Sequence, residues 1–233
     1  MGGGFGRART AVAEGLLGRG SPRSVLANPC VHAYLSAMSK SSPTRADAPD
    51  LFDAPMLPDG FKYRPDVISA DEEHELVERF GTLPFKEFEF HGFVGKRRVV
   101  SFGWRYDFNQ GGLQKTEEIP PFLLPLRQRA AGFAGLSADA FEQVLLTEYR
   151  PGASIGWHRD RSVFGEVIGL SLGAACIFRM RRKAGAGWER ATIEMTPRSA
   201  YLLAGAARRD WEHSIPALEA RRYSVTFRNF ARR

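Results

Sequence analysis

A histidine and an aspartate stand two residues apart at His158 and Asp160, shortly after the turn pair Pro151-Gly152. Along a β-strand, residues i and i+2 point to the same face, so the imidazole and the carboxylate can converge on one point. Two histidines and one carboxylate form the triad that holds non-haem Fe(II) and leaves coordination sites open for substrate and oxygen. The pair therefore predicts a metal site that a second histidine downstream must complete.

The histidine expected to complete this site is His213, in the segment 210–216. It shares the strand-rich C-terminal part of the chain with His158 and Asp160. The other histidines lie elsewhere, namely His32 in the N-terminal tail, His74 on a predicted helix and His91 in an aromatic-rich stretch. A position near a strand end and before a proline suits a ligand that enters from the side of the site opposite His158.

The last predicted strand has one polar face. Alternation with a period of two places four polar side chains on that face: Arg222, Ser224, Thr226 and Arg228. The other face is apolar, with Tyr223, Val225 and Phe227. Two unpaired guanidiniums inside a protein would cost on the order of several kcal/mol, whereas a small dianion would satisfy both through bidentate hydrogen bonds. 2-Oxoglutarate, a keto acid that chelates Fe(II), meets that need, and the Tyr149 hydroxyl could donate to it.

Composition limits the partners that can be expected. The 233 residues are 43% hydrophobic, enough for one sizeable domain with a core, and no apolar run approaches the roughly 20 residues that span a bilayer. The net charge of +7 is concentrated in residues 1–45, which hold six basic side chains and one acidic one. The basic clusters 96–98 and 179–183 are better indicators of a polyanion, and they are expected either to hold nucleic-acid phosphates or to be solvated turns. Arg208-Arg209 is predicted to be a surface turn.

The first 50 residues are rich in Gly, Ala, Arg and Ser, a composition that predicts disorder. They loosely resemble an organelle transit peptide, and alternatively they form an upstream extension ahead of a translation start at Met38. The two cysteines, Cys30 and Cys176, lie far apart, and Cys176 is expected to be a buried thiol in a strand. A disulfide scaffold is therefore not expected, and a cytoplasmic location fits.

Helices are expected ahead of most of the strands. Ser69 and Glu72 form a capping-box pattern that opens a helix ending at Gly81. A second helix is expected from residue 120 to about 135, and Ser137 is expected to cap a short third one. Strands are expected at 99–103, 144–149, 167–172, 175–181, 191–195, 200–203 and 223–230. Many short strands at this spacing predict a sandwich or barrel, so the fold class is mainly β with flanking helices (α+β).

Taken together, the motifs resemble a known family. The matching pieces are Tyr149-x-Pro-Gly, Ile-Gly-Trp-His158-x-Asp160, Ser171-Leu-Gly, Arg-x-Asp-Trp-x-His213-x-Ile-Pro and Arg222-Tyr-x-x-Thr-Phe-Arg228. Their order and spacing, over roughly residues 55–230, are similar to those of the AlkB family of Fe(II)/2-oxoglutarate dioxygenases. The resemblance implies a double-stranded β-helix (jelly-roll) core at 144–230 in a dioxygenase domain at 51–233, with a possible substrate-recognition lid at 85–112.

The resemblance also implies a role for individual residues. Iron would be bound by His158, Asp160 and His213; the distal carboxylate of 2-oxoglutarate would pair with Arg222; and Arg228 and Tyr149 would orient that cofactor. Thr147 and Ser224 stand where the bacterial DNA-repair archetype has asparagines. Both have shorter side chains that still form hydrogen bonds, so they are expected to keep the contacts to the cofactor with a different geometry.

The implied reaction is oxidative and uses O2 as co-substrate. 2-Oxoglutarate is decarboxylated to succinate while an N-methyl carbon is hydroxylated, and the hemiaminal then releases formaldehyde and the repaired base. Ser162 stands where the archetype has a second aspartate used in base recognition, which leaves the substrate open. The candidates for substrate binding are Trp104, Tyr106, Arg161 and Arg182.

The leading hypothesis is therefore a monomeric enzyme that demethylates N-alkylated bases in DNA or RNA. One rival keeps the chemistry and changes the substrate to a protein or a small molecule, which the absence of the second aspartate favours. The other rival is a non-catalytic binding module on the same fold, against which the intact triad argues.

Overall fold

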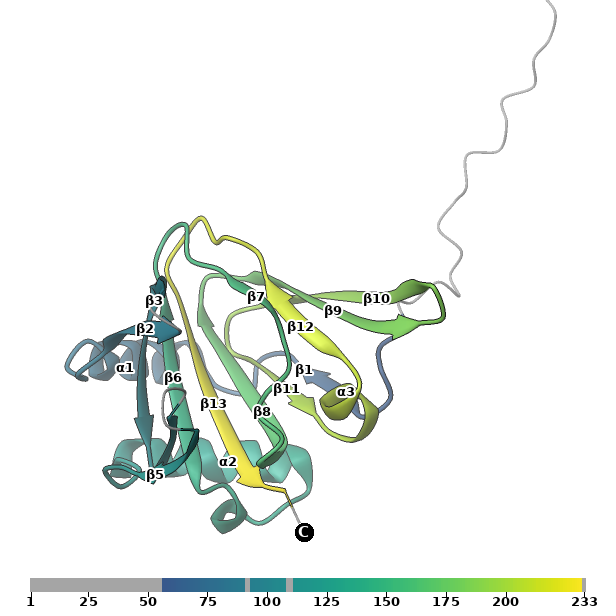
Figure 1. Cartoon of the computed structure of the whole chain (residues 1–233). Coiled ribbons are helices and arrows are strands. Elements are labelled where there is room, and N and C mark those ends of the chain that lie inside the picture. The colour runs from purple at the N-terminus through teal and green to yellow at the C-terminus, as the bar shows by residue number, and fades with distance from the viewer. Residues whose placement is uncertain (1–55, 91–92, 108–110, 232–233) are drawn as a thin grey trace, which may run out of the picture. The chain divides into compact units, whose positions relative to one another are not determined.

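Two antiparallel sheets and a short ribbon hold the strands of the computed structural model, which describes residues 56–90, 93–107 and 111–231 (Figure 1). The larger sheet has the order β1-β11-β8-β13-β6-β3-β2 and the smaller one β10-β9-β12-β7. The strands of the larger sheet are β1 (Phe61–Arg64), β2 (Lys86–Phe90), β3 (Phe93–Phe102), β6 (Gln143–Tyr149), β8 (Phe164–Gly173), β11 (Ser199–Leu203) and β13 (Arg222–Phe230). Those of the smaller sheet are β7 (Ile155–His158), β9 (Cys176–Ala184), β10 (Gly187–Met195) and β12 (Glu212–Ile215), and the ribbon pairs β4 (Trp104–Asp107) with β5 (Gly112–Lys115).

The helices begin and end close to where the sequence signals predict. Helix α1 (Ala70–Phe80) has Ser69 as its N-cap, and both hydrogen bonds of the capping box with Glu72 are present. A 3-10 turn, η1 (Pro121–Leu123), leads into α2 (Leu124–Ala134), which ends at Gly135 in the left-handed conformation. The expected third helix is a single 3-10 turn, η2 (Ala138–Ala140), and Ser137 makes no capping bond there. The short helix is therefore present with Ser137 at its N-cap position, and only the expected capping hydrogen bond is missing.

The alternation of strand β13 determines where the core and the site lie. Tyr223, Val225 and Phe227 join a hydrophobic cluster with side chains of α1 and α2, which cover that face of the larger sheet. A second cluster, which includes Phe178 and Met180 of β9, fills the space between the two sheets. The polar face of β13 lines a cavity on this inner side. One strand thus contributes to the core under the helices and to the cavity between the sheets.

The predicted fold class is confirmed. The chain is mainly β with flanking helices, its sheets are antiparallel as in a jelly roll, and the sheets of the described residues do not close into a barrel. Cys176 is buried at the start of β9, as expected. Among the described residues, no helix is long and apolar enough to cross a bilayer. The predictions for residues 1–50, including a start at Met38, and those for His91 and Phe108 fall outside the described ranges.

Candidate active site

All the residues predicted to bind iron or 2-oxoglutarate line one cavity between the two sheets. They are Thr147, Tyr149, His158, Asp160, His213, Arg222, Ser224 and Arg228. The smaller sheet provides the two histidines. In the larger sheet, β6 provides Thr147 and Tyr149, and β13 provides its polar face. The sequence prediction that these side chains converge is therefore consistent with the fold.

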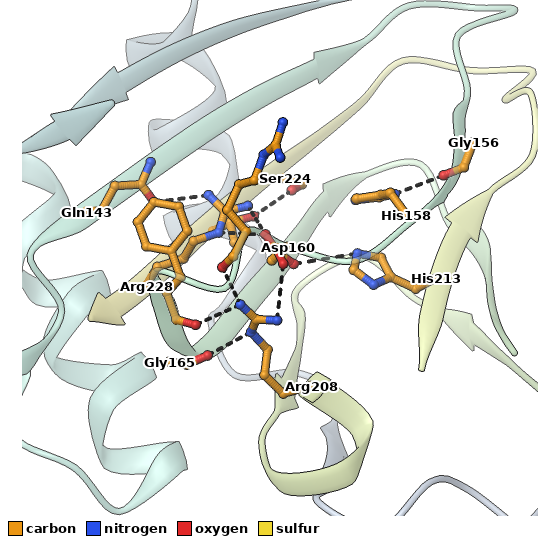
Figure 2. Close-up of polar contacts among 12 residues, drawn as sticks. Gln143, Gly156, His158, Asp160, Gly165, Arg208, His213, Ser224 and Arg228 are labelled. Atoms are coloured by element: carbon orange, nitrogen blue, oxygen red, sulfur yellow. Dashed lines mark hydrogen bonds and ion pairs between the residues drawn. The ribbon is translucent and has the colours of Figure 1, made fainter. Parts of the chain in front are cut away.

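The two histidines lie on neighbouring strands. His158 is the last residue of β7, and its Cα partner across the antiparallel pairing is His213 of β12. Their ring centroids are 4.2 Å apart. His213 therefore stands beside His158, where the sequence had suggested entry from the opposite side. The Nδ1 atom of His158 donates to the carbonyl of Gly156 at 2.8 Å, which leaves Nε2 with a free lone pair for a metal (Figure 2).

Asp160 lies in the loop that follows β7, so it does not continue the strand as its spacing from His158 had suggested. Its Oδ2 atom is 3.8 Å from Nε2 of His213. Its Oδ1 atom accepts from Arg228, whose Nη1 also donates to Gln143 (Figure 2). In the described part of the chain no three His, Cys, Asp or Glu side chains are already drawn together as a finished metal centre. The three candidate ligands instead face one cavity, with Asp160 held from behind.

The electrostatics keep these groups in the protonation states that a metal requires. Burial lowers the pKa of His213 to about 3, with a further contribution from His158, and burial also lowers the pKa of His158. Burial alone would raise the pKa of Asp160, but Arg228 and the nearby histidines hold it well below its usual range. At neutral pH both imidazoles are therefore neutral and the carboxylate is charged, which is the donor set for a divalent metal.

A buried arginine fixes the loop that carries Asp160. Arg208, in helix α3 (Gly205–Arg209), is 8% exposed and donates to two backbone carbonyls of that loop and two at the start of β8 (Figure 2). Its partners are Gly165 at 2.8 Å, Asp160 at 3.3 Å, Arg161 at 2.7 Å and Phe164 at 2.7 Å. The prediction that Arg208-Arg209 is a surface turn was wrong for Arg208, whereas Arg209 is exposed. A guanidinium has five N–H donors, so one arginine side chain can bridge several carbonyls of this segment.

Arg222 is the best fit in the cavity for an anionic cofactor. It is 1% exposed, and its Nε donates to the hydroxyl of Ser171 at 2.9 Å. Its Nη1 is buried and has no hydrogen-bond partner among the described residues. An unsatisfied buried guanidinium nitrogen is costly, and a carboxylate placed against it would remove that cost. The donor set of the cavity therefore suits 2-oxoglutarate together with Fe(II).

Arg97 is a cavity residue that the sequence prediction missed. The cluster 96–98 was expected to be a phosphate contact or a solvated turn, but it lies within strand β3, where Arg97 is the Cα partner of Tyr149. Arg97 lines the cavity, and its guanidinium carbon is 4.0 Å from the ring centroid of Phe88. Three consecutive basic residues place a cation on both faces of a strand, so residue type alone could not show which one points inward.

The predicted substrate residues lie outside the cavity lining. Arg161, in the Asp160 loop, stacks on the ring of Tyr106 at 4.8 Å, so these two are brought together. Trp104 packs edge-on against Phe230 at 5.7 Å. Arg182 pairs with Glu189, stacks on Trp211 at 5.2 Å and lines a separate open cleft with Arg159 and Lys183.

Comparison with known proteins identifies the family. The model of the 2OG-Fe(II) oxygenase superfamily matches residues 61–228. An Arabidopsis thaliana protein named "Alkylated DNA repair protein ALKBH8 homolog" is 27% identical over 88% of this chain and 65% of its own length. "Uncharacterized protein L905" of Acanthamoeba polyphaga mimivirus is 33% identical over 38% of this chain and 48% of its own length. The chain thus spans less than two thirds of either relative.

A solved structure shows the same fold. "The structure of OsALKBH1" superposes with a TM-score of 0.60 at 15% identity, and the match covers 74% of this chain and 98% of that one. Together with the family match and the relative named as an alkylated-DNA repair protein, it confirms the resemblance drawn from the sequence motifs. The chain belongs to the 2OG-Fe(II) oxygenase superfamily and is similar to its AlkB-type dioxygenases, and the family implies Fe(II) and 2-oxoglutarate as cofactors with O2 as co-substrate.

Proposed function

We propose that this protein removes N-linked alkyl groups from bases in nucleic acid, with Fe(II) bound by His158, Asp160 and His213. Bound Fe(II), with 2-oxoglutarate and O2, supplies the oxidation of the alkyl carbon. The hydrogen bond from His158 to Gly156 orients one imidazole, and Phe178, stacked on the ring of His213 at 5.2 Å, orients the other. These contacts fix the direction of both candidate ligands before a metal binds.

The observation that carries the proposal is Nη1 of Arg222, which has no partner in the described part of the chain and lies in the same cavity as both histidines. It would pair with the distal carboxylate of 2-oxoglutarate, and Ser171 would hold the guanidinium in place. Tyr149, whose ring centroid is 5.1 Å from the guanidinium carbon of Arg222, would donate its hydroxyl to the same cofactor. Thr147 and Ser224, which face each other across β6 and β13, would complete the contacts.

A nucleic-acid substrate is supported by features at the surface near the site. The Arg161 guanidinium stacked on Tyr106 offers a cation and an aromatic face beside the loop of Asp160. The separate cleft is lined by Arg159, Arg182 and Lys183 against the acids Glu189 and Asp210, so its lining has an excess of one positive charge. The Arabidopsis relative is named as an alkylated DNA repair protein, which points to the same substrate class.

The alternative substrate is an N-methylated protein side chain or a small molecule. Ser162 favours it, because an exposed serine supplies no charge that would recognise a base two residues beyond Asp160. This alternative uses the same cofactor site, so the two proposed functions differ only in the substrate.

The test is a set of reactions with the Fe(II)-loaded protein under air. Methylated oligonucleotides form one arm and methylated peptides the other, and succinate and formaldehyde are both measured. Formaldehyde from an oligonucleotide, in step with succinate, is the expected result. Formaldehyde released only from a peptide would support the alternative substrate. Oligonucleotide binding that is weak and independent of salt concentration would agree with that outcome.

A further inference from the structure

The smaller sheet has an outer face that the candidate active site does not use. Alternate residues of β9 and β10 point inward to the second hydrophobic cluster, among them Phe178, Met180 and Ala191. The residues between them point outward, and the pairing of the strands places them side by side. Helices α1 and α2 pack against the larger sheet, whereas the outward residues Trp188 and Arg190 of β10 are exposed (Figure 1).

Cations and indole rings alternate across this outer face. The guanidinium carbon of Arg181 lies 4.3 Å from the ring centroid of Trp157 and 4.2 Å from that of Trp188. The guanidinium carbon of Arg179 lies 5.2 Å from the ring of Trp157, and Nζ of Lys183 lies 5.0 Å from the ring of Trp188. Trp188 is 38% exposed, so part of its ring is accessible to a stacking partner. Basic groups interleaved with accessible aromatic rings are the pattern with which proteins bind single-stranded nucleic acid.

The basic side chains of this face outnumber its acids. The outward residues of β9, β10 and β12 include two acids, Glu194 and Glu212, against four bases: Arg179, Arg181, Lys183 and Arg190. Arg181 is paired with Glu212 at 2.7 Å, and Nε of Arg179 donates to the hydroxyl of Ser214 at 3.1 Å. Among the described residues the other three bases form no ion pair with an acid, so their charges are available to phosphates.

The position of Trp157 connects this outer face with the candidate active site. β7 is an edge strand of the smaller sheet, and its residues Trp157 and His158 are consecutive. Consecutive side chains of a strand point to opposite faces, so His158 faces the cavity while Trp157 faces outward, against Arg181. A nucleic-acid strand whose target base is in the cavity can therefore pass around the edge of β7 and continue across the outer face.

We infer that the outer face of the smaller sheet binds the single-stranded segment that flanks the target base. A base of this flanking segment stacks on the exposed ring of Trp188, and Arg179, Lys183 and Arg190 contact its phosphates. The inference rests on the proposed function and adds to it a second contact surface, on the side of the sheet that faces away from the cofactor cavity. Stacking and phosphate contacts read no sequence, so this surface strengthens the binding of any strand long enough to reach it.

The length of the oligonucleotide tests the inference. A trinucleotide and a dodecanucleotide, both single-stranded, carry the same methylated base at or near the centre. We expect the full chain, loaded with Mn(II) and 2-oxoglutarate, to bind the dodecanucleotide at least about 10-fold more tightly in a fluorescence anisotropy titration, because stacking and phosphate contacts both add affinity. The kcat/KM for formaldehyde release by the Fe(II)-loaded protein should show the same preference for the longer strand.

Variants assign this preference to the outer face. Trp188→Ala and Arg190→Gln should each weaken binding of the dodecanucleotide by about 3- to 10-fold and leave kcat/KM for the trinucleotide within about two-fold of the parent. Arg190→Gln should also reduce the slope of log affinity against log salt concentration by about 0.7, the value for one phosphate contact on a single strand. Lys62→Gln is the control, because it removes an exposed cation from β1 of the larger sheet, and it should change neither the affinity nor the slope.

Each contrary result has its own meaning. Formaldehyde release with equal affinity and equal kcat/KM for the two lengths overturns the inference and leaves the proposed function standing, and this comparison requires no variant to fold. A preference for the dodecanucleotide that Trp188→Ala and Arg190→Gln leave unchanged also overturns it, because the flanking segment would then bind elsewhere. Binding of poly-glutamate that depends on Trp188, while dodecanucleotide binding does not, would assign the face to an acidic protein instead. Formaldehyde from neither oligonucleotide, despite succinate production, removes the proposed function and this inference with it.

Discussion

Arg228 contacts a single oxygen of Asp160 through two of its nitrogens. Nε of Arg228 donates to Oδ1 at 2.8 Å, and Nη2 lies 2.6 Å from the same atom. The other oxygen, Oδ2, faces His213 at 3.8 Å. One oxygen of the carboxylate is therefore occupied from behind and the other is presented to the histidines. This arrangement suits a carboxylate that binds a metal through one oxygen, with a cation fixing its rotation.

Replacement of Arg228 should weaken metal binding. Arg228→Gln frees Asp160 to rotate, and we expect Mn(II) affinity to fall by about 10-fold, as is usual for partners that orient a metal ligand. Arg228→Lys keeps the charge but lacks the paired nitrogens of the guanidinium, so its Mn(II) affinity should lie between those of the parent protein and Arg228→Gln. Titration of Mn(II) followed by electron paramagnetic resonance measures the change. Unchanged Mn(II) affinity combined with lost 2-oxoglutarate binding would assign Arg228 to the cofactor instead.

Arg208 is expected to stabilise the Asp160 loop. Arg208→Met removes the side-chain hydrogen bonds to four carbonyls of residues 160–165, and the loss should lower the free energy of unfolding by about 2–4 kcal/mol. Mn(II) affinity should fall as well, because the loop carries Asp160. Arg209→Met is the matched control, since that side chain is exposed. Urea unfolding of both variants checks the prediction, and equal stabilities would contradict it.

Arg222 should dominate the affinity for 2-oxoglutarate. Arg222→Met removes a buried charged partner of the distal carboxylate, and the dissociation constant should rise by about 100-fold. Calorimetry with the Mn(II)-loaded protein measures it without turnover. Arg221→Met is the control because its side chain is 62% exposed and lies outside the cavity. A similarly small change in the dissociation constant for both substitutions would contradict the placement of Arg222 in the cofactor site.

The free energy of unfolding should depend on Glu148 in a pH-dependent way. Burial favours the neutral acid, but Arg98, Arg150 and Arg221 lower the pKa of Glu148 below its usual value. A carboxyl with a lowered folded-state pKa stabilises the fold above its unfolded pKa of about 4.3, and this contribution is lost as pH falls through the folded pKa. Glu148→Gln should therefore cost about 2–4 kcal/mol at pH 7 and progressively less below pH 4.

Urea unfolding at a series of pH values measures this dependence. Glu142→Gln, an exposed acid just before the same strand, is the control and should show no such trend. A destabilisation by Glu148→Gln that stays constant from pH 7 to pH 3 would contradict the assigned role of the carboxylate.

Features that one segment specifies by itself could be predicted from sequence. The alternation of β13 separates apolar from polar residues, so both its core face and its cavity face followed from residue type. The capping box of α1 is equally local. The spacing of the motifs predicted that His158, Asp160 and His213 belong to one site, and all three line the same cavity.

Features that depend on distant partners could not be predicted in this way. Strands β7 and β12 have four residues each and an irregular register, too short for any periodicity to appear. Arg208 is buried because its guanidinium donates to carbonyls of residues 160–165, far away in the sequence, which no local pattern reveals. The inward direction of Arg97 follows from the pairing of β3 with β6, so it required the register of the sheet.

The most direct test of the account measures succinate and formaldehyde together in the parent protein and in His158→Ala. With Fe(II), 2-oxoglutarate, O2 and a methylated oligonucleotide, the parent should release the two products in equal amounts. His158→Ala should release neither, because it removes one of the three proposed iron ligands and its imidazole lone pair. Full formaldehyde release by His158→Ala would contradict the proposed iron site, and the absence of both products from the folded, Fe(II)-loaded parent would contradict the proposed activity.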